Sequence, residues 1–181
     1  MCIIRCAVSV QFSDLHPTEF KRQYLNYRPA VGDAALLRKN ASLTLPDRFT
    51  AIPESYDWRR PDNGRPVAVT PVKNQGQCGS CWAFSATAQA ESAWILAGNP
   101  AALLSDEQTV DCDKVDGGCN GGDTVTAFEY MIKAGGIMSE VDYPYTAGRT
   151  GRAGSCQYDA KKAVAKISSF SSAHTSAHAL L

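Results

Sequence analysis

Residues 71–88 read PVKNQGQCGSCWAFSATA, and the two cysteines in this stretch decide how the rest of the chain is interpreted. Cys78 and Cys81 lie in a loop punctuated by glycines, directly before a helical pattern. Apolar residues on one face predict a helix from Cys81 to Ala97, which the sequence GNP at 98–100 ends. Two cysteines at this spacing can bind zinc or form a redox dithiol. Alternatively, one of them is structural and the other is a reactive thiol.

The position of Cys81 favours a reactive thiol. At the first turn of a helix several backbone N–H groups lack a partner and the helix dipole is positive, and both stabilise a thiolate. The same place offers two donors for a developing oxyanion, the backbone N–H of Cys81 and the side-chain amide of Gln75. Gly76 and Gly79 let the intervening backbone double back, so that the amide faces the sulfur.

The rival explanations of the cysteine pair fit less well. A redox dithiol is expected after a buried strand, whereas the residues before Cys78 are polar and include Pro71. A zinc site usually needs a second close ligand pair, but six residues separate Cys112 from Cys119 and no histidine is near them. The plain structural alternatives are a buried apolar cysteine at 81 and a solvated loop amide at Gln75.

Charge, apolar stretches and the number of cysteines indicate which partners and which redox compartment to expect. The 181 residues include 18 basic and 18 acidic side chains, so no net charge favours nucleic acid or an anionic membrane as a partner. Arg5 interrupts the apolar start, so we predict no signal peptide, and no stretch is long enough for a membrane helix. No metal site or cofactor motif is predicted. Five of the seven cysteines follow residue 70, and this odd number suggests two bridges and one free thiol in an oxidising compartment.

Other elements are predicted from capping residues and periodicity. A helix within residues 12–25 can be capped by Thr18, and residues 27–53 have the character of a linker. Residues 67–72 predict a short edge strand. Ser105 and Gln108 form a capping-box pattern before a short helix that ends near Asp111. A further helix is expected from Asp123, as cap, to Lys133.

These motifs together resemble the papain-like cysteine peptidases, in particular their cathepsin L-like branch. The stretch at 71–88 resembles the active-site segment of that family, and PESYDWR, LSDEQTVDCD, GGCNGG and YPYTA surround it in the family's order. FSDLHPTEF at 12–20 resembles the end of the family's inhibitory prosegment. The resemblance covers residues 12–170 and implies an α+β, two-lobe fold, here mainly its helical lobe. We therefore expect a prosegment remnant and linker at 1–50, the helical-lobe part of the peptidase domain at 51–170 and an unassigned tail at 171–181.

The resemblance also implies a role for individual residues. Cys81 corresponds to the nucleophile and Gln75 to the oxyanion donor of a cysteine endopeptidase that forms an acyl-enzyme on peptide or protein substrates. Gly121 and Gly122 correspond to glycines whose backbone runs antiparallel to the bound peptide, although from sequence alone they could equally be turn residues before a helix. The implied disulfides are Cys78–Cys119 and Cys112–Cys156.

Partners and location follow from the resemblance alone. It implies possible inhibition by cystatin-like proteins and a lysosomal, vacuolar or extracellular location. Asp123 and Thr124 stand where cathepsin L-like members commonly have apolar residues lining the main specificity pocket, so a polar wall is suggested. Residues 59–66, RRPDNGRP, form an insertion relative to the family, with no inferred role.

The chain departs from the family at both ends. The family's catalytic histidine and asparagine lie about 130–150 residues after the cysteine, whereas 100 residues follow Cys81 here. His174 and His178 lack the family's histidine motif, so neither is predicted to be the base. We therefore expect an incomplete zymogen that is inactive by itself and exposes the apolar surface meant for the β-rich lobe. The alternative is a non-catalytic pseudoenzyme that binds peptides or partners.

Overall fold

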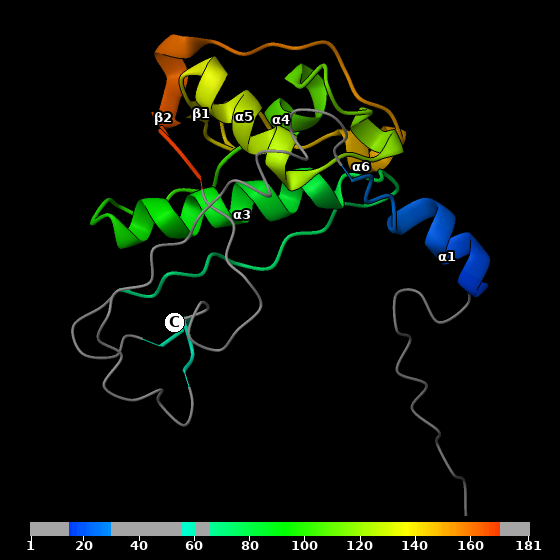
Figure 1. The fold of residues 1–181 in the computed structure, drawn as a ribbon, viewed down its shortest axis with the longest axis horizontal. Helices are drawn as coiled ribbons and strands as arrows, with labels where there is room; N and C mark the ends of the chain where they lie inside the picture. The colour runs from blue at the N-terminus through cyan, green and yellow to red at the C-terminus, as the bar shows by residue number, and fades with distance from the viewer. Residues whose placement is uncertain (1–14, 30–55, 61–65, 171–181) are drawn as a thin grey trace, which may run out of the picture.

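The computed structural model describes residues 15–29, 56–60 and 66–170, which Figure 1 shows in colour. Its elements in chain order are α1 (Pro17–Tyr24), α3 (Cys81–Leu96), α4 (Asp106–Cys112), the 3-10 turn η1 (Gly118–Asn120), α5 (Thr124–Ala134), β1 (Ile137–Met138), α6 (Ala147–Thr150), the 3-10 turn η2 (Ala160–Lys162) and β2 (Ala163–Ala165). Helices with one small sheet agree with the expected α+β class. Cys2, Cys6, His174, His178 and the tail at 171–181 lie outside the described residues.

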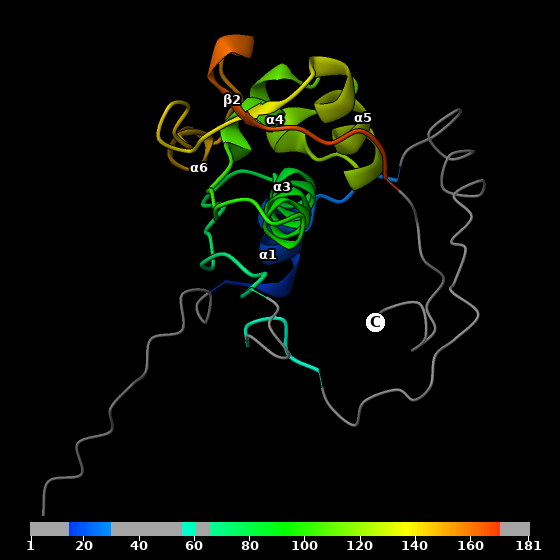
Figure 2. The same ribbon diagram turned by 90° about the vertical axis from the view of Figure 1, so that its left-hand side faces the viewer.

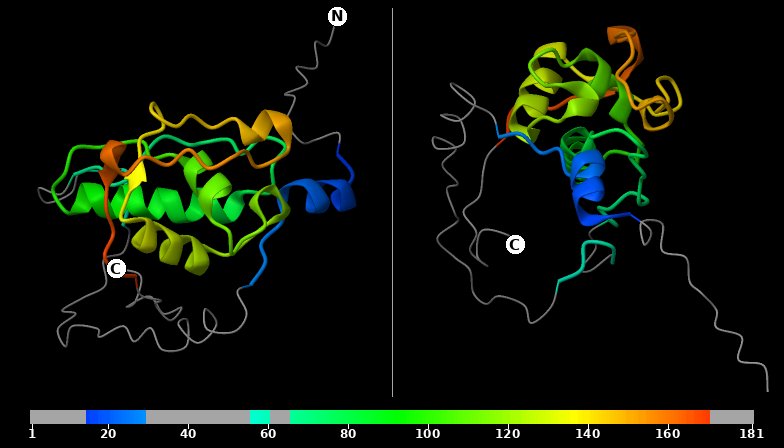
Figure 3. Two further views of the ribbon diagram at one scale, coloured as in Figure 1. Left: turned by 90° about the horizontal axis from the view of Figure 1, so that it is seen from above. Right: turned by 90° about the vertical axis from the view of Figure 1, so that its right-hand side faces the viewer.

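Helix α3 is the axis around which the other elements are arranged. Figures 1 and 2 show α4, α5, α6 and the small sheet together on one side of α3, while α1 lies beside its N-terminal end. Figure 3 shows the same relation from above, with the chain before α3 running along the helix. The loop directly before Cys81, the first residue of α3, contacts Asn26 after α1 and Cys119 of η1 through Gly79.

The core lies between α3 and the layer above it. Three alanines on the inner face of α3, Ala83, Ala86 and Ala90, are almost completely buried, and their small side chains let α5 approach closely. Larger side chains fill the remaining space. They are Trp82, Leu104, Val110, Met131 and Ile137.

A two-stranded sheet closes one end of this layer. Strands β1 and β2 are antiparallel, with Ile137 opposite Ala165 and Met138 opposite Ala163, and the register is irregular between the two residues of β1. Gly136 precedes β1 with φ +153°, and a Cβ there would meet the side chain of Ala163 at 2.9 Å. The glycine therefore allows the chain to pass close against β2.

A buried ion cluster attaches residues 70–73 to α3 and α4. The Lys73 ammonium lies 2.6 Å from Glu91 Oε1 and 3.0 Å from Asp106 Oδ2. Glu91 is fully buried, accepts hydrogen bonds from the Thr70 hydroxyl at 2.5 Å and from the Leu104 N–H at 2.7 Å, and so has partners at both oxygens. These bonds position the segment that leads into the loop before Cys81.

The helix limits expected in the middle of the chain are confirmed within a residue or two. Helix α3 spans Cys81–Leu96, and α5 begins after its cap Asp123, whose Oδ1 accepts from the Val125 N–H at 3.0 Å. Gly135 ends α5 in the left-handed conformation with φ +79°. Local capping signals were therefore sufficient to define these helices.

Three local predictions were wrong. The cap of α1 is His16 rather than Thr18, because its Nδ1 accepts from the Thr18 N–H at 3.3 Å. Ser105 caps α4 as expected, but the Gln108 side chain does not reach back, since it bonds instead to the Tyr130 hydroxyl, Gly136 O and Met138 N. Residues 67–72 form no strand: Val67, Val69 and Val72 are exposed, and Thr70 donates its hydroxyl to the buried Glu91.

Candidate active site

The candidate site begins with Cys81, the first residue of α3 and a free, partly exposed thiol. Ser80 occupies the cap position, yet its hydroxyl makes no capping bond. It bonds instead to the Tyr145 hydroxyl, at 2.8 Å. The Tyr145 hydroxyl donates to Gln75 O at 2.8 Å. In the described part of the chain, no residue accepts a hydrogen bond from the Cys81 N–H. The positive end of α3 therefore keeps a donor directed to the place where the thiol lies.

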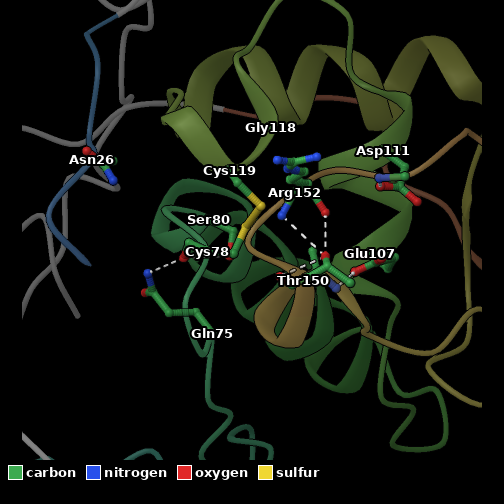
Figure 4. The surroundings of a disulfide bond; sticks show 12 residues. Asn26, Gln75, Cys78, Ser80, Glu107, Asp111, Gly118, Cys119, Thr150 and Arg152 are labelled. Atoms are coloured by element: carbon green, nitrogen blue, oxygen red, sulfur yellow. Dashed lines mark hydrogen bonds between the residues drawn. A yellow bond between two sulfur atoms is a disulfide. The ribbon is translucent and has the colours of Figure 1, made fainter. Parts of the chain in front are cut away.

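Gln75 supplies a second donor close to this loop. Its side-chain Nε2 donates to Cys78 O at 2.8 Å, as Figure 4 shows. An amide nitrogen carries two N–H donors, so this bond orients the group and leaves one donor for another acceptor. Gly76, with φ +59°, turns the chain here, and a Cβ on it would meet Gly148 O at 2.5 Å. The chain therefore turns at Gly76 as predicted, while the approach of the Gln75 amide to the Cys81 sulfur stays a prediction.

A disulfide joins the loop to the turn η1. Cys78 bonds to Cys119 (Figure 4). Beside this bridge the Gly79 N–H donates to Cys119 O at 3.0 Å. The indole N–H of Trp82 donates to Gly118 O at 3.1 Å, which adds a third connection. Because Cys78 pairs with Cys119 and not with Cys81, the loop is not a redox dithiol.

A second disulfide, Cys112–Cys156, joins the end of α4 to the segment before η2. Both bridges are the pairs that the family resemblance implied. Among the cysteines of the described residues, Cys81 is the one that remains free. This agrees with the odd number of late cysteines, from which one free thiol was inferred.

Gly121 and Gly122 lie together beside η1 but have different surroundings. Gly121 has φ +108°, and a Cβ on it would collide with the backbone oxygen of Asn26. A Cβ on Gly122 would meet Asp116 Cγ at 2.6 Å and the Trp82 ring at 2.7 Å. Gly121 therefore allows another backbone to approach closely. At Gly122 the Asp116 side chain and the Trp82 ring leave no room for a Cβ.

The N-terminal segment, residues 15–29, lies against these glycines. Tyr27 forms an isolated parallel bridge with Gly122, and the Arg28 N–H donates to Gly122 O at 3.0 Å. The Asn26 side chain lies against Gly79, where a Cβ would collide with its Nδ2. Residues 26–28 thus contact both the loop before Cys81 and the pair of glycines, and occupy the space between them.

Buried polar groups support the backbone around the glycines. Asp116 accepts from the Asp123 N–H at 3.0 Å and from the Thr126 hydroxyl at 2.6 Å. Burial raises the pKa of nearby Asp113 to about 7, with a smaller raising effect of the Asp116 charge and against the lowering effect of the Val115 N–H. Burial also raises the pKa of Tyr145 to about 12, so this tyrosine stays neutral and donates its hydroxyl hydrogen to Gln75 O.

Several of these residues were not predicted from the sequence. Tyr27 and Arg28 fall in the predicted linker and Asn26 lies between it and the predicted helix, since nothing in the identity of these residues indicates a partner almost 100 positions away. Tyr145 belongs to the motif YPYTA, but the motif does not show that its hydroxyl contacts Ser80. These contacts depend on tertiary structure alone.

Two further observations concern groups that could take part in chemistry. The histidine within the described ranges, His16, caps α1 and lies 2.7 Å from the Thr18 hydroxyl. Over residues 15–29, 56–60 and 66–170, no cluster of three or more His, Cys, Asp or Glu side chains is arranged to hold a metal ion.

No helix in the same ranges has the length and apolar character needed to cross a membrane.

Known proteins are similar to this chain in sequence. Residues 52–181 match the family described as papain family cysteine protease. Cysteine proteinase 15A of Pisum sativum is 45% identical over 170 residues, and cysteine proteinase 1 of Zea mays is 46% identical over 175 residues. Each alignment covers 89% of this chain but 43% and 44% of the relative, so the chain spans less than half the length of these curated relatives.

Solved structures show the same fold. The digestive procathepsin L2 proteinase from Tenebrio molitor larval midgut has a TM-score of 0.70 and 37% identity, covering 88% of this chain and 49% of that one. A recombinant stem bromelain precursor has a TM-score of 0.64 and 35% identity, covering 87% and 46%. Both comparisons confirm the papain-like fold, and the procathepsin L2 structure confirms the cathepsin L-like resemblance. With a matched region that includes α3, both disulfides and the paired glycines, the chain belongs to the papain family of cysteine proteases.

Proposed function

We propose that this chain is part of a cysteine endopeptidase in which Cys81 attacks the peptide bond. The observation that carries the proposal is the arrangement at the start of α3. Cys81 there has a free thiol and a backbone N–H without an acceptor among the described residues, and the Gln75 amide, oriented by Cys78 O, belongs to the loop directly before it. A nucleophile next to two donors suits acyl transfer, in which negative charge develops on the carbonyl oxygen.

The proposed reaction has two halves. The Cys81 thiolate attacks the carbonyl carbon, a C–S bond forms, and the carbonyl oxygen becomes an oxyanion that accepts from the Cys81 N–H and the Gln75 amide. The C–N bond then breaks as the leaving amine takes a proton from a general acid. Water attacks the resulting thioester, the acid product leaves, and the thiol is restored.

The general acid in this proposal is an imidazole from outside the described residues. His16 is engaged at the start of α1, and the family resemblance implies a histidine and an asparagine in the β-rich lobe. Apolar side chains support a surface for such a lobe, since Val69 and Val72 are exposed beside Phe84 and Ala88 on the outer side of α3. We assign residues 51–170 to the helical lobe and no role to 171–181.

The N-terminal segment is proposed to act as an inhibitory occupant, as part of a prosegment and linker at residues 1–50. It pairs with Gly122 in the parallel sense, whereas the resemblance implies an antiparallel substrate. Its peptide bonds would therefore meet Cys81 in the reverse direction. The solved relatives described as procathepsin and precursor forms support this role.

Substrates, inhibitors and location follow from the same proposal. Peptide or protein substrates would pair with Gly121 and Gly122, and cystatin-like proteins are proposed as inhibitors. Two disulfides favour an oxidising compartment, which supports a lysosomal, vacuolar or extracellular site of action.

The test uses the complete protein and a fluorogenic peptide under reducing conditions. Cys81→Ala should abolish turnover, and Gln75→Ala should reduce kcat/KM about 100-fold or more because one oxyanion donor is lost. Gln77→Ala is the matched control, since this exposed neighbour contributes a backbone bond to Gly148. An unchanged rate in Gln75→Ala would contradict the oxyanion assignment, while peptide binding without turnover would favour the pseudoenzyme alternative.

A further inference from the structure

The hydroxyl of Tyr145 lies between the two ends of the loop that carries the proposed oxyanion donors. It donates to Gln75 O at 2.8 Å, and a carbonyl oxygen can only accept, so the single hydrogen of the phenol is used there. The hydroxyl of the fully buried Ser80 therefore gives its own hydrogen to Tyr145 at 2.8 Å, rather than to Cys78 O at 3.5 Å. One hydrogen-bonded chain thus joins Ser80, the residue before the thiol, to Gln75 through the phenol.

Contacts other than the hydroxyl fix the place of Tyr145. Its backbone N–H donates to Glu140 Oε1 at 2.8 Å, and its ring meets the Phe84 ring edge-on, with centroids 4.8 Å apart. The buried Glu107 holds the next residue, since it accepts from the Thr146 N–H at 3.0 Å and from the Thr146 hydroxyl at 2.6 Å. The backbone and ring of Tyr145 therefore keep their place without the hydroxyl, so the hydroxyl can impose a position on the loop.

The segment after Tyr145 also packs closely against the loop. A Cβ on Gly148 would lie 2.8 Å from Gln75 O and 2.8 Å from the Tyr145 ring. The Gln77 N–H donates to Gly148 O at 2.8 Å, so the chain on the other side of Gly76 is held by the same segment. Both sides of this turn therefore have a fixed support, and a shift of Gln75 O toward Gly148 is opposed by contact.

We propose that Tyr145 is a positioning residue that sets the separation of the two oxyanion donors, the Gln75 amide and the Cys81 N–H. Its hydroxyl holds the backbone of the first donor directly, and it holds the residue before the second through Ser80. The inference rests on the proposed peptidase function and adds a residue that acts on the transition state without touching the substrate. Donors stabilise an oxyanion best when they are aimed at it before the reaction, so a loop that is free to shift loses part of their effect.

The first experiment removes the hydroxyl and keeps the ring, by Tyr145→Phe in the complete protein with a fluorogenic peptide. We expect kcat to fall about 10- to 100-fold with KM nearly unchanged, because misplacing a donor costs less than removing it. Tyr143→Phe is the matched control, since it removes another buried phenol hydroxyl of the same YPY motif, one that donates to Asp111 Oδ2 at 2.8 Å. Both variants should show a lower Tm, but Tyr143→Phe should retain the kcat of the wild type.

Two reagents separate the oxyanion site from the thiol. When a peptide aldehyde binds, the Cys81 sulfur adds to the carbonyl carbon, the thiol proton ends on the oxygen, and that oxygen takes the oxyanion position. Iodoacetamide alkylates the same thiolate with release of iodide and develops no oxyanion. In Tyr145→Phe the Ki of the aldehyde should rise about tenfold or more. The rate constant of alkylation should equal that of the wild type, whereas a merely structural role would change both quantities or neither.

A double variant tests whether Tyr145 acts through Gln75. With the Gln75 amide absent, loss of the hydroxyl should cost little more, so Gln75→Ala with Tyr145→Phe should turn over nearly as fast as Gln75→Ala alone. Should Tyr145→Phe fail to fold, Ser80→Ala breaks the same hydrogen-bonded chain at its other end. It should give a smaller loss of kcat, with the same contrast between the aldehyde and iodoacetamide.

Three results would overturn the role of Tyr145. They are an unchanged kcat in Tyr145→Phe, an equal loss of kcat in Tyr143→Phe, and losses that multiply in the double variant. Absence of Cys81-dependent turnover in the wild type is a different result, which would contradict the proposed function and the role of Tyr145 with it.

Discussion

Asp113 is the residue at which the structure links stability most directly to pH. Its side chain is almost fully buried, and one carboxyl oxygen has no hydrogen-bond partner among the described residues. Burial raises its pKa from 3.8 to about 7, and the adjacent Asp116 carboxyl acts in the same direction. Ionisation is therefore opposed by the folded state.

The sign of the resulting pH dependence follows from proton binding. Between about pH 4 and pH 7, Asp113 holds a proton in the folded chain but not in the unfolded chain, so the free energy of unfolding falls as pH rises through this window. Asp106, whose pKa burial also raises to about 7 despite Lys73, acts with the same sign. The chain should therefore be less stable at pH 8 than at pH 4.5.

Replacing Asp113 by asparagine tests this explanation. Asp113→Asn keeps an acceptor for the Val115 N–H and adds a donor toward Asp116, without a charge to bury. We expect a Tm above that of wild type at pH 8 and nearly the same Tm at pH 4, measured by thermal denaturation. A variant whose Tm falls in parallel with wild type over the whole range would show that Asp113 does not titrate between these limits.

At the scale of elements, helix α4 offers two buried hydroxyls in opposite situations. Ser105 caps the helix by accepting from the Gln108 N–H at 3.0 Å and donates to Tyr143 O at 2.6 Å. Thr109 Oγ1, also completely buried, has no partner within the described part of the chain. The same chemical group therefore stabilises the fold at one position and opposes it at the other.

Substitution of each hydroxyl should change stability in opposite directions. Ser105→Ala should lower the free energy of unfolding by about 1–3 kcal/mol, because a cap is lost and a buried carbonyl loses its donor. Thr109→Val, of nearly equal shape, should leave stability unchanged or raise it, since no bond is broken. Urea denaturation measures both, and a loss in Thr109→Val comparable to that in Ser105→Ala would indicate a partner for Thr109 outside the described residues.

At the scale of the whole molecule, α3 carries apolar side chains on its outer as well as its inner side. Trp82 and Ala86 are buried in the core, while Phe84 and Ala88 line a shallow surface depression with Val72, which is fully exposed. A helix that is apolar on all sides is expected to be covered on all sides. This surface therefore fits the proposed contact with a second lobe.

The exposed surface should promote association of the isolated chain. Val72→Lys places a charge in its centre and should reduce self-association at micromolar concentrations, as measured by sedimentation velocity. Val141→Lys is the control, because this valine is 90% exposed on a different part of the molecule. Equal effects of the two substitutions would mean that net charge, and not this surface, governs association.

The sequence by itself determined the features that depend on neighbouring residues. Helix α3 begins at Cys81 because a glycine-rich loop is followed by a run of good helix formers, and α5 is defined by Asp123 and Gly135 at its ends. Capping and periodicity act within a few residues, so they can be recognised without a structure. The family resemblance supplied the disulfide pairs, which local pattern alone leaves open.

Only the tertiary structure decided which distant groups share a partner. Gln108 has the right position for a capping box, but its amide bonds instead to Tyr130 of α5, to Gly136 after α5 and to Met138 of β1. Asn26 and Tyr27 lie on the glycines of the site because α1 is placed against the start of α3. In the unfolded chain each of these polar side chains can bond to water. Burial removes the water, so each side chain must bond to whichever polar group the fold places next to it.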